Sequence, residues 1–314
     1  MKKHYLPFEK PLKDLDIEIE KLISNDPESE NIKILDDKRT EVEKEIFKDL
    51  SPWETVQLAR HPNRPYTLDY INKWCENFTE LHGDKAYSDD SAVVAGIGII
   101  EGVKLAIIGQ QKGRNTKENI QRNFGMMKPE GYRKALRVMK LAEKFNLPIV
   151  TLIDTPGADP GIGAEERGQG YAIAKNLFEM ASIETQILSV VIGEGASGGA
   201  LGIGLCDKMI MLEHTWFSVI SPEGCASILW KDSAKAPEAA DSLKLTPKDL
   251  MEHNICNSIV YEPSGGAHRH FDETADILKD AILVEIKSMQ ESITKNYLDL
   301  RVERYDKLGV FRED

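Results

Sequence analysis

The chain has 314 residues, and 40 Lys and Arg against 52 Asp and Glu give it a formal net charge of −12. Hydrophobic residues make up 41% and charged residues 29% of the sequence, which excludes a mostly disordered chain and allows one large domain or two modest ones. The acidic balance argues against nucleic acid as the main partner.

Membrane and secreted classes are also disfavoured. The longest apolar run, residues 91–100, is well short of the roughly 20 residues of a membrane-spanning helix, and no apolar run follows the lysines at the start of the chain. The cysteines are too far apart for a paired-cysteine zinc motif or a compact disulfide framework. We therefore expect a cytoplasmic protein with reduced thiols and no metal in this chain. The cysteines are Cys75, Cys206, Cys225 and Cys256.

The first 52 residues are expected to form a charged helical hairpin that lies on another part of the molecule. Two apolar stripes at helical spacing are separated by the breaker 24–28, and almost half of the first 50 residues are charged. The stripes are Leu12, Leu15, Ile19 and Leu22, and then Leu35, Val42, Ile46 and Leu50.

Residues 53–314 are expected to form one domain in which strands alternate with helices. This alternation predicts βαβ crossovers in a layered α/β core. The predicted strands are Ala92–Ile100, Val103–Gln110, Pro148–Asp154, Gln186–Ile192, Lys208–Leu212 and Trp216–Ile220. The predicted helices are Pro129–Asn146, Gly163–Ala181, Gly198–Leu205, Ser221–Trp230, Glu273–Gln290 and Tyr297–Asp306.

One stretch departs from the acidic balance of the chain. Residues 104–144 hold 11 Lys and Arg and 3 Asp and Glu, and 11 minus 3 gives a net charge of +8. A solvated helix face is the ordinary explanation of such a run. Its concentration in the loop 110–127 and the following helix favours a positive surface for an anionic ligand that carries phosphates or carboxylates.

Two glycine-rich turns each follow a predicted buried strand and precede a helix. The first spans residues 155–163, and the second spans residues 193–200. Free N–H groups and the positive end of a helix dipole point outward at such turns, which makes them anion sites. Glycine also permits tight strand–helix packing, but two such turns in succession favour a binding role.

The second turn matches two further motifs, and both remain open as alternatives. The spacing of Gly193, Gly195 and Gly198, with Glu213 beyond, matches a dinucleotide-binding fingerprint. The spacing of Gly195, Ser197 and Gly199 matches the nucleophile elbow of a serine hydrolase. No Asp-to-His pairing stands out among the candidate bases, which are His214, His253, His268 and His270.

Several longer runs spread over most of the chain carry the most specific signal. They are Arg122–Met126, Pro129–Ala135, Gly163–Gln169 and Ser218–Ala226, extended by Arg64–Tyr70 and Gly265–His268. Together they resemble the alpha subunit of bacterial acetyl-CoA carboxylase carboxyltransferase. The resemblance implies a crotonase-like fold of stacked ββα units behind the N-terminal hairpin. The chain departs from the usual family pattern at Ala196, where glycine is common, and at Asp159, where an aromatic residue is common.

The resemblance also implies a reaction and partners. A beta subunit of similar fold, which carries a four-cysteine zinc site, would join this chain in an alpha2beta2 assembly. The pair would transfer a carboxyl group from carboxybiotin, held by a biotin carboxyl carrier protein, to acetyl-CoA and so form malonyl-CoA, the first committed step of fatty acid biosynthesis. A separate biotin carboxylase would consume ATP, and this chain has no phosphate loop that would bind it.

The site residues follow from the same resemblance. It assigns the backbone N–H groups of Gly198 and Gly199 to an oxyanion hole for the ureido oxygen of biotin. No side-chain base is required, because the released biotin anion can itself take the methyl proton of acetyl-CoA. The pocket would be lined by Gly157, Ala158, Gly195, Ala196, Ser197 and Ala200. Charge alone suggests anion contacts from Lys112, Arg114, Arg122, Arg133 and Lys134.

Overall fold

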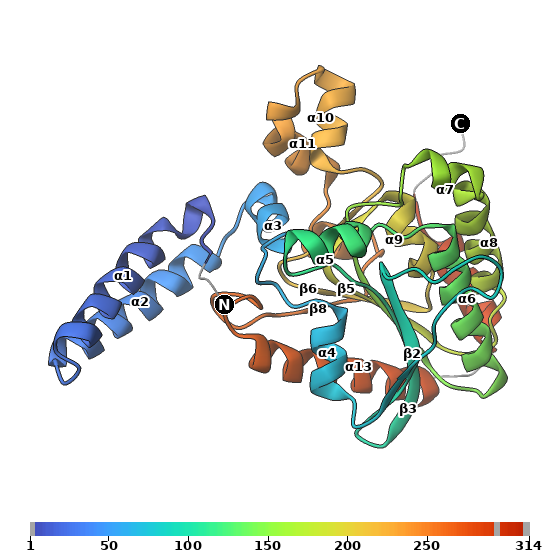
Figure 1. The fold of residues 1–314 in the computed structure, drawn as a ribbon, viewed down its shortest axis with the longest axis horizontal. Coiled ribbons are helices and arrows are strands. Elements are labelled where there is room, and N and C mark those ends of the chain that lie inside the picture. Colours follow the sequence, from blue (N-terminus) through green and yellow to red (C-terminus); the bar gives the residue numbers. More distant parts are fainter. Residues whose placement is uncertain (1–3, 292–295, 310–314) are drawn as a thin grey trace.

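A computed structural model describes residues 4–291 and 296–309 (Figure 1). The α-helices are α1 (Lys10–Asn25), α2 (Glu30–Phe47), α3 (Pro52–Ala59), α4 (Thr67–Trp74), α5 (Thr116–Gln121), α6 (Pro129–Lys144), α7 (Ile162–Glu166), α8 (Gln169–Ala181), α9 (Ser197–Gly204), α10 (Pro222–Trp230), α11 (Ala236–Leu243), α12 (Pro247–Glu252), α13 (Phe271–Glu291) and α14 (Tyr297–Asp306). The strands are β1 (Phe78–Glu80), β2 (Val93–Ile100), β3 (Val103–Gln110), β4 (Ile149–Thr155), β5 (Ile187–Ala196), β6 (Lys208–Leu212), β7 (Trp216–Ser218) and β8 (Ser258–Val260). Short 3-10 helices are η1 (Pro7–Glu9), η2 (Asn123–Gly125) and η3 (Ser233–Lys235).

The strands form one mixed sheet in the order β1-β2-β3-β4-β5-β6-β8, with β7 beside the end of β5. The strands β1, β2 and β3 are antiparallel, and the hairpin turn between β2 and β3, at Glu101 and Gly102, has φ of 46° and 80°, as a tight hairpin requires. From β3 to β8 the neighbouring strands are parallel. Their carboxyl ends therefore lie at one edge of the sheet, where both glycine turns emerge.

Helices cover both faces of the sheet and give three layers (Figure 1). One core cluster packs α6, α8 and α9 against the sheet, and the other packs α4 and α13 against its opposite face. Alternate residues of β4 serve the two clusters: Ile149 and Ile153 face the first, while Val150 and Leu152 face the second. A strand buried on both faces is expected in a parallel sheet and explains the unbroken apolar run in the sequence.

Two predicted segments differ in the structure, and several further elements were not predicted. The helix predicted over Gly163–Ala181 is two helices, because Gly168 adopts φ of 82° and interrupts it. The strand predicted to end at Ile192 continues to Ala196, since its last residues pair with β7. Most of the elements that the pattern did not predict are short, and they include α3, α4, α11 and α12.

The N-terminal hairpin projects from the sheet domain and contacts it at its base (Figure 1). There Leu12 and Phe47 of the hairpin bury their side chains with Leu58 of α3. The expectation of a helical hairpin is confirmed. It lies on the rest of the molecule only through this base, and the outer part of the hairpin remains exposed.

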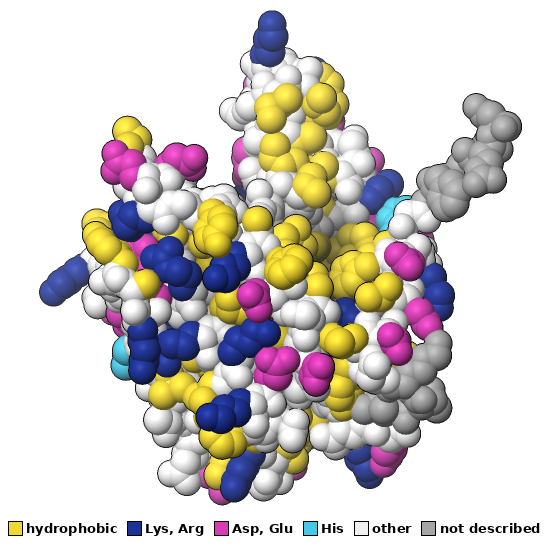
Figure 2. All heavy atoms as spheres, turned by 90° about the vertical axis from the view of Figure 1, so that its right-hand side faces the viewer, with side chains coloured by type: hydrophobic (Ala, Val, Ile, Leu, Met, Phe, Trp, Pro, Cys, Tyr) yellow, Lys and Arg dark blue, Asp and Glu magenta, His cyan; other side chains and the backbone are white. Residues whose placement is uncertain are grey.

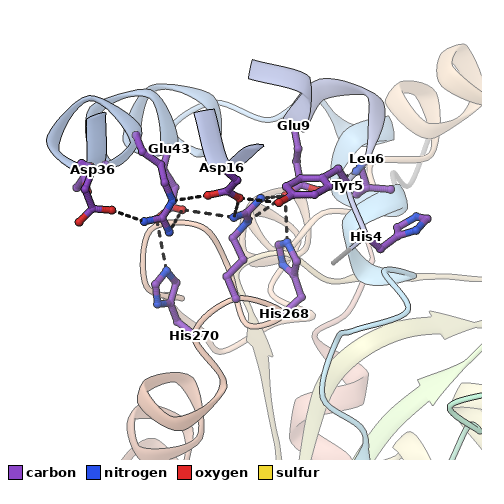
Figure 3. A network of polar contacts seen from close by, with 12 residues as sticks. His4, Tyr5, Leu6, Glu9, Asp16, Asp36, Glu43, His268 and His270 are labelled. Carbon is purple, nitrogen blue, oxygen red and sulfur yellow. Dashed lines mark hydrogen bonds and ion pairs between the residues drawn. The ribbon is translucent and has the colours of Figure 1, made fainter. Parts of the chain in front are cut away.

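A polar network joins the hairpin base to the loop before α13 (Figure 3). The fully buried carboxylate of Glu9 accepts hydrogen bonds from Arg269, with both nitrogen–oxygen distances at 3.1 Å, and lies 3.2 Å from His268. Burial raises the pKa of Glu9, but His268, the Leu6 amide and Arg269 outweigh burial and lower the pKa to about 2. The hairpin is thus held by a charged contact as well as by apolar packing.

Candidate functional site

The two glycine turns contact each other through their backbones at the carboxyl edge of the sheet. A Cβ atom on Gly199 would lie 2.2 Å from the carbonyl carbon of Gly157 and 2.5 Å from the nitrogen of Ala158. Gly157 itself has φ of 151°, a conformation that favours glycine. Glycine at 157 and 199 therefore permits an approach that no side chain would allow.

The first turn of α9 presents backbone N–H groups without an acceptor of their own. The first residues of a helix lack intrahelical acceptors, and the residue before this helix, Ala196, has no side chain that could cap them. Among the described residues, no loop carbonyl or side chain accepts from Gly198 or Gly199. Ser197 is exposed, Gly198 is half-buried and Gly199 is buried, so an oxygen atom with negative charge can approach this turn at Gly198.

The departure from the family pattern at Ala196 causes no backbone strain at that residue. Ala196 has φ of −101° and ψ of 131°, an ordinary extended conformation, and its side chain is buried. At the other departure, the carboxylate of Asp159 accepts a hydrogen bond from the Gly161 amide at 2.9 Å within its own turn.

Ser197 has the backbone geometry of a nucleophile elbow but lacks the partners of a nucleophile. Its φ is 60°, between a strand and a helix. No base contacts its hydroxyl in the part of the chain that the structure describes. Of the candidate bases, His268 contacts Glu9 and His270 contacts Glu43 at the hairpin base (Figure 3), and neither has a recorded contact with Ser197.

The glycines of the dinucleotide motif have packing roles. A Cβ on Gly193 would lie 2.2 Å from a carboxylate oxygen of Asp154, and one on Gly195 would lie 2.5 Å from the ring of Phe217. Glycine at these positions leaves room for side chains of the protein itself. The spacing of the glycines is therefore explained by packing, without a bound pyrophosphate.

A network of ion pairs, buried at Asp154 and Glu194 and partly exposed at Arg60 and Glu223, lies behind the glycine turns. Lys112 bridges Asp154 at the end of β4 and Glu194 in β5, at 2.7 and 2.8 Å. Arg60 continues the network, since it contacts Glu194 and Glu223 of α10, both at 2.6 Å. The Asp154 carboxylate also accepts a hydrogen bond from the Glu194 amide at 3.1 Å. The network therefore connects the ends of two neighbouring strands to a helix outside the sheet.

The shifts in pKa within this network of ion pairs follow from burial and from opposite charge. Burial lowers the pKa of Lys112, but the carboxylates of Asp154 and Glu194 outweigh it and hold the pKa above its ordinary value. Burial raises the pKa of Asp154 despite the nearby ammonium group. Burial also raises the pKa of Glu194, but Lys112 and Arg60 outweigh it, so that the net shift is downward.

The five basic residues suggested as anion contacts do not gather at the turns. Lys112 lies beside them, but its ammonium group is already paired with two carboxylates. Arg114 pairs with Asp69, and Arg122 donates to the Ser91 carbonyl at 2.9 Å.

The other two basic residues, Arg133 and Lys134, also differ from the expectation that they contact an external anion. Arg133 donates to Asp84 at 2.7 Å, and Lys134 is fully buried and lies 2.9 Å from Asp89. A lysine without exposed surface cannot meet an external anion. Four of the five suggested residues, all but Arg122, thus pair with acidic residues from other segments, and Lys134 in particular is a structural cation.

A separate cavity of about 430 Å³ lies at the hairpin base (Figure 3). Within the described residues, Glu9, His61 and His268 place potential ligand atoms within 4.8 Å of one another, as a metal site would. However, Arg269 donates to Glu9, and the Asn63 amide donates to Nδ1 of His61, which leaves the ring proton on Nε2. This donor set fits an ion-paired contact rather than a metal ion.

Exposed apolar side chains gather on the projection that α10 and α11 form, and Figure 2 shows them there and in the area beneath. We call Val219, Ile228, Leu229 and Trp230 the apolar arm; their exposed fractions are 81%, 71%, 65% and 39%. Patches of this kind mark contact surfaces. Across residues 4–291 and 296–309, no helix combines the length and apolar character of a membrane span.

Comparisons with known protein families and with individual relatives point to the same family. The profile of the family described as acetyl co-enzyme A carboxylase carboxyltransferase-like matches residues 5–309. The acetyl-coenzyme A carboxylase carboxyl transferase subunit alpha of Xanthomonas campestris pv. campestris is 52% identical over 99% of both chains. The subunit of the same name from Flavobacterium johnsoniae is 49% identical over 98% of this chain and 99% of its own.

Solved structures share the fold at low sequence identity. Transcarboxylase 12S matches 70% of this chain and 44% of its own, with a TM-score of 0.55 and 18% identity. A Pseudomonas malonate decarboxylase hetero-tetramer in complex with coenzyme A matches 76% of this chain and 93% of its own, with a TM-score of 0.59 and 10% identity. These likenesses confirm the expected crotonase-like carboxyltransferase fold.

Proposed function

Because the chain belongs to the family of acetyl-CoA carboxylase carboxyltransferase alpha subunits, we propose that it supplies the biotin-side oxyanion hole of the transferase. Carboxybiotin supplies the carboxyl group, and negative charge develops on its ureido oxygen as the bond from nitrogen to that group breaks. The N–H groups of Gly198 and Gly199 would donate hydrogen bonds to this oxygen.

One observation carries the proposal. Within the part of the chain that the structure describes, the N–H groups at the start of α9 have no acceptor outside their own helix, and they lie where Gly199 meets the Gly157 turn. Preorganised donors of this kind contribute roughly a factor of 10²–10³ each to the rate. Gly157, Ala158, Gly195, Ala196, Ser197 and Ala200 would line the pocket around the biotin ring.

The charges nearest the turns support an electrostatic role rather than acid–base catalysis. Lys112 is held charged between two carboxylates, and no base among the described residues contacts Ser197. We therefore assign no proton transfer to a side chain of this subunit. The methyl proton of acetyl-CoA would pass to the released biotin anion.

The proposed partner is a beta subunit that completes the active site in an alpha2beta2 assembly. The family name of the relatives, subunit alpha, implies such a partner. The apolar arm supports this proposal, because it leaves a large apolar surface uncovered on the chain alone and its helix is linked through Glu223 and Arg60 to the second glycine turn. A biotin carboxyl carrier protein and a biotin carboxylase would supply the carboxylated biotin.

The test is reconstitution with the beta subunit of the same organism. We expect the assembled complex to decarboxylate malonyl-CoA in the presence of free biotin, and the isolated chain to be inactive. Assembly without carboxyl transfer, under conditions in which a relative's complex is active, would contradict the proposal.

A further inference from the structure

Gln110, the last residue of β3, connects the two glycine turns through one buried side chain. Its Oε1 accepts a hydrogen bond from the Asp154 amide at 3.0 Å, and its Nε2 donates to the Gly199 carbonyl at 2.9 Å. The residue has no exposed surface. Because one partner is a donor and the other an acceptor, a neutral amide in this orientation satisfies both, whereas a carboxylate would not.

Gln110 is itself held in place. The hydroxyl of Thr67, the first residue of α4, donates to the Gln110 carbonyl at 2.7 Å. A Cβ on the preceding residue, Gly109, would lie 2.4 Å from that same hydroxyl oxygen, which shows how closely α4 packs on the end of β3. The amide of Gln110 is thus anchored to a rigid part of the fold.

Few side-chain hydrogen bonds hold the segment that Gln110 contacts. Ala196 offers no side-chain cap, and the next three residues are Ser197, Gly198 and Gly199, two of which have no side chain. Tyr132 adds a longer contact, with its hydroxyl 3.4 Å from the Gly199 carbonyl. The hydrogen bond from Gln110 is therefore the shorter of the two side-chain contacts recorded for the Gly199 carbonyl.

We infer that Gln110 is a positioning residue for the oxyanion hole: it fixes Gly199 against the Gly157 turn and so aims the N–H groups of Gly198 and Gly199. This inference rests on the proposed function. It assigns no contact with the substrate to Gln110. An error of about 1 Å in the position of such donors can cost about 10²-fold in rate.

The test compares two neighbouring glutamines in the complex with the beta subunit. Gln111 is the matched control, because its side chain also makes two hydrogen bonds to the main chain, at the Leu68 amide and the Lys112 carbonyl, and neither partner belongs to a glycine turn. We expect Gln110→Met to lower kcat of the assembled complex by about 10- to 100-fold with the KM for malonyl-CoA unchanged. Gln111→Met is expected to keep kcat within about twofold.

A second variant gives a pH signature that loss of folding alone would not produce. In Gln110→Glu, a protonated carboxyl group keeps one donor and one acceptor, whereas a carboxylate would face the Gly199 carbonyl without a donor. Burial and the carboxylates of Asp154 and Glu194 favour the neutral form, and Lys112 opposes it. We expect kcat of this variant to fall as pH rises, because the introduced carboxyl group loses its proton. The pH profile of the unchanged protein should lack this fall.

Two outcomes would overturn the inference: equal kcat losses in Gln110→Met and Gln111→Met, or the same pH profile in Gln110→Glu and the unchanged protein. If Gln110→Met fails to assemble, the profile of Gln110→Glu decides. Failure of the proposed function is distinguishable, because it would remove carboxyl transfer from the unchanged complex as well.

Discussion

Gly199 and Gly157 approach so closely that a Cβ atom on the first would lie 2.2 Å from the carbonyl carbon of the second. Real Cβ atoms do not approach backbone so closely, so Gly199→Ala must push the two turns apart. We expect carboxyl transfer by the assembled complex to fall by about 10²-fold or more, because the N–H donors would move with the turn.

Gly198 provides the control for this substitution. A Cβ there would meet only the side chain of Ile173, at 3.6 Å, which is ordinary contact. Gly198→Ala is therefore expected to cost markedly less than Gly199→Ala when kcat is measured under the same conditions. Equal losses would show that the close approach of the turns does not govern activity.

Ser197→Ala is expected to retain carboxyl transfer within about tenfold. The hydroxyl has no base, and the proposed donors belong to the main chain. A serine nucleophile would instead lose activity by a factor on the order of 10⁴–10⁶. Ser197→Gly is a useful companion, because glycine accepts the φ of 60° without strain and should leave activity and stability at least as high.

Arg64 and Glu262 form a buried pair whose disruption should destabilise the fold. Two nitrogens of Arg64 donate to Glu262 at 2.6 and 3.2 Å, and a third donates to the Ile192 carbonyl just before the second glycine turn. Both residues are buried. Arg64→Met would leave the carboxylate without its partner, and we expect a loss of about 3–5 kcal/mol in the free energy of unfolding.

Chemical denaturation measures this loss, and a double-mutant cycle isolates the pair. Arg64→Met combined with Glu262→Met removes both charges, so the double variant should be more stable than Arg64→Met alone. A double variant whose loss equals the sum of the single losses would argue against the pair.

Acid should weaken the contact of the hairpin base. Burial, and then His268, lower the pKa of His61 from 6.5 to about 3. The His61 ring therefore binds a proton more readily in the unfolded chain than in the folded one. The contribution of neutral His61 to the free energy of unfolding is complete above about pH 6.5 and is lost as pH falls toward 3. Glu9, whose pKa is lowered from 4.5 to about 2, adds a second loss below about pH 4.5.

Unfolding free energies measured between pH 7 and pH 4 test this dependence. His61→Gln is expected to reduce the slope between pH 6.5 and 4.5 and to leave the loss below pH 4.5 that Glu9 contributes. An unchanged slope in the upper range would contradict the assignment to His61.

The sequence predicted those features that depend on short stretches of chain. The strand, glycine turn and helix around Gly157 and around Gly199 follow one another directly, so apolar runs and glycines suffice to locate them. Long helices such as α6 and α13 were predicted for the same reason. The eight-residue helices α3 and α4 were missed, because their apolar patterns are too brief to stand out.

Features that depend on residues far apart in the sequence could not be predicted from short stretches of chain. The acids that neutralise Arg133 and Lys134 are Asp84 and Asp89, which precede them by more than 40 positions, so the positive run suggested a surface where the fold makes internal ion pairs. Gln110 was missed for the same reason, since its partners follow 44 and 89 positions later. Neither spacing is a periodicity that a single sequence displays.

The most direct measurement is a structure of this chain assembled with its beta subunit and with biotin bound. It should place the ureido oxygen about 2.7–3.1 Å from the nitrogens of Gly198 and Gly199, the range of an oxyanion hole. A ureido oxygen bound elsewhere in an active complex, with these two amides facing solvent, would contradict the account.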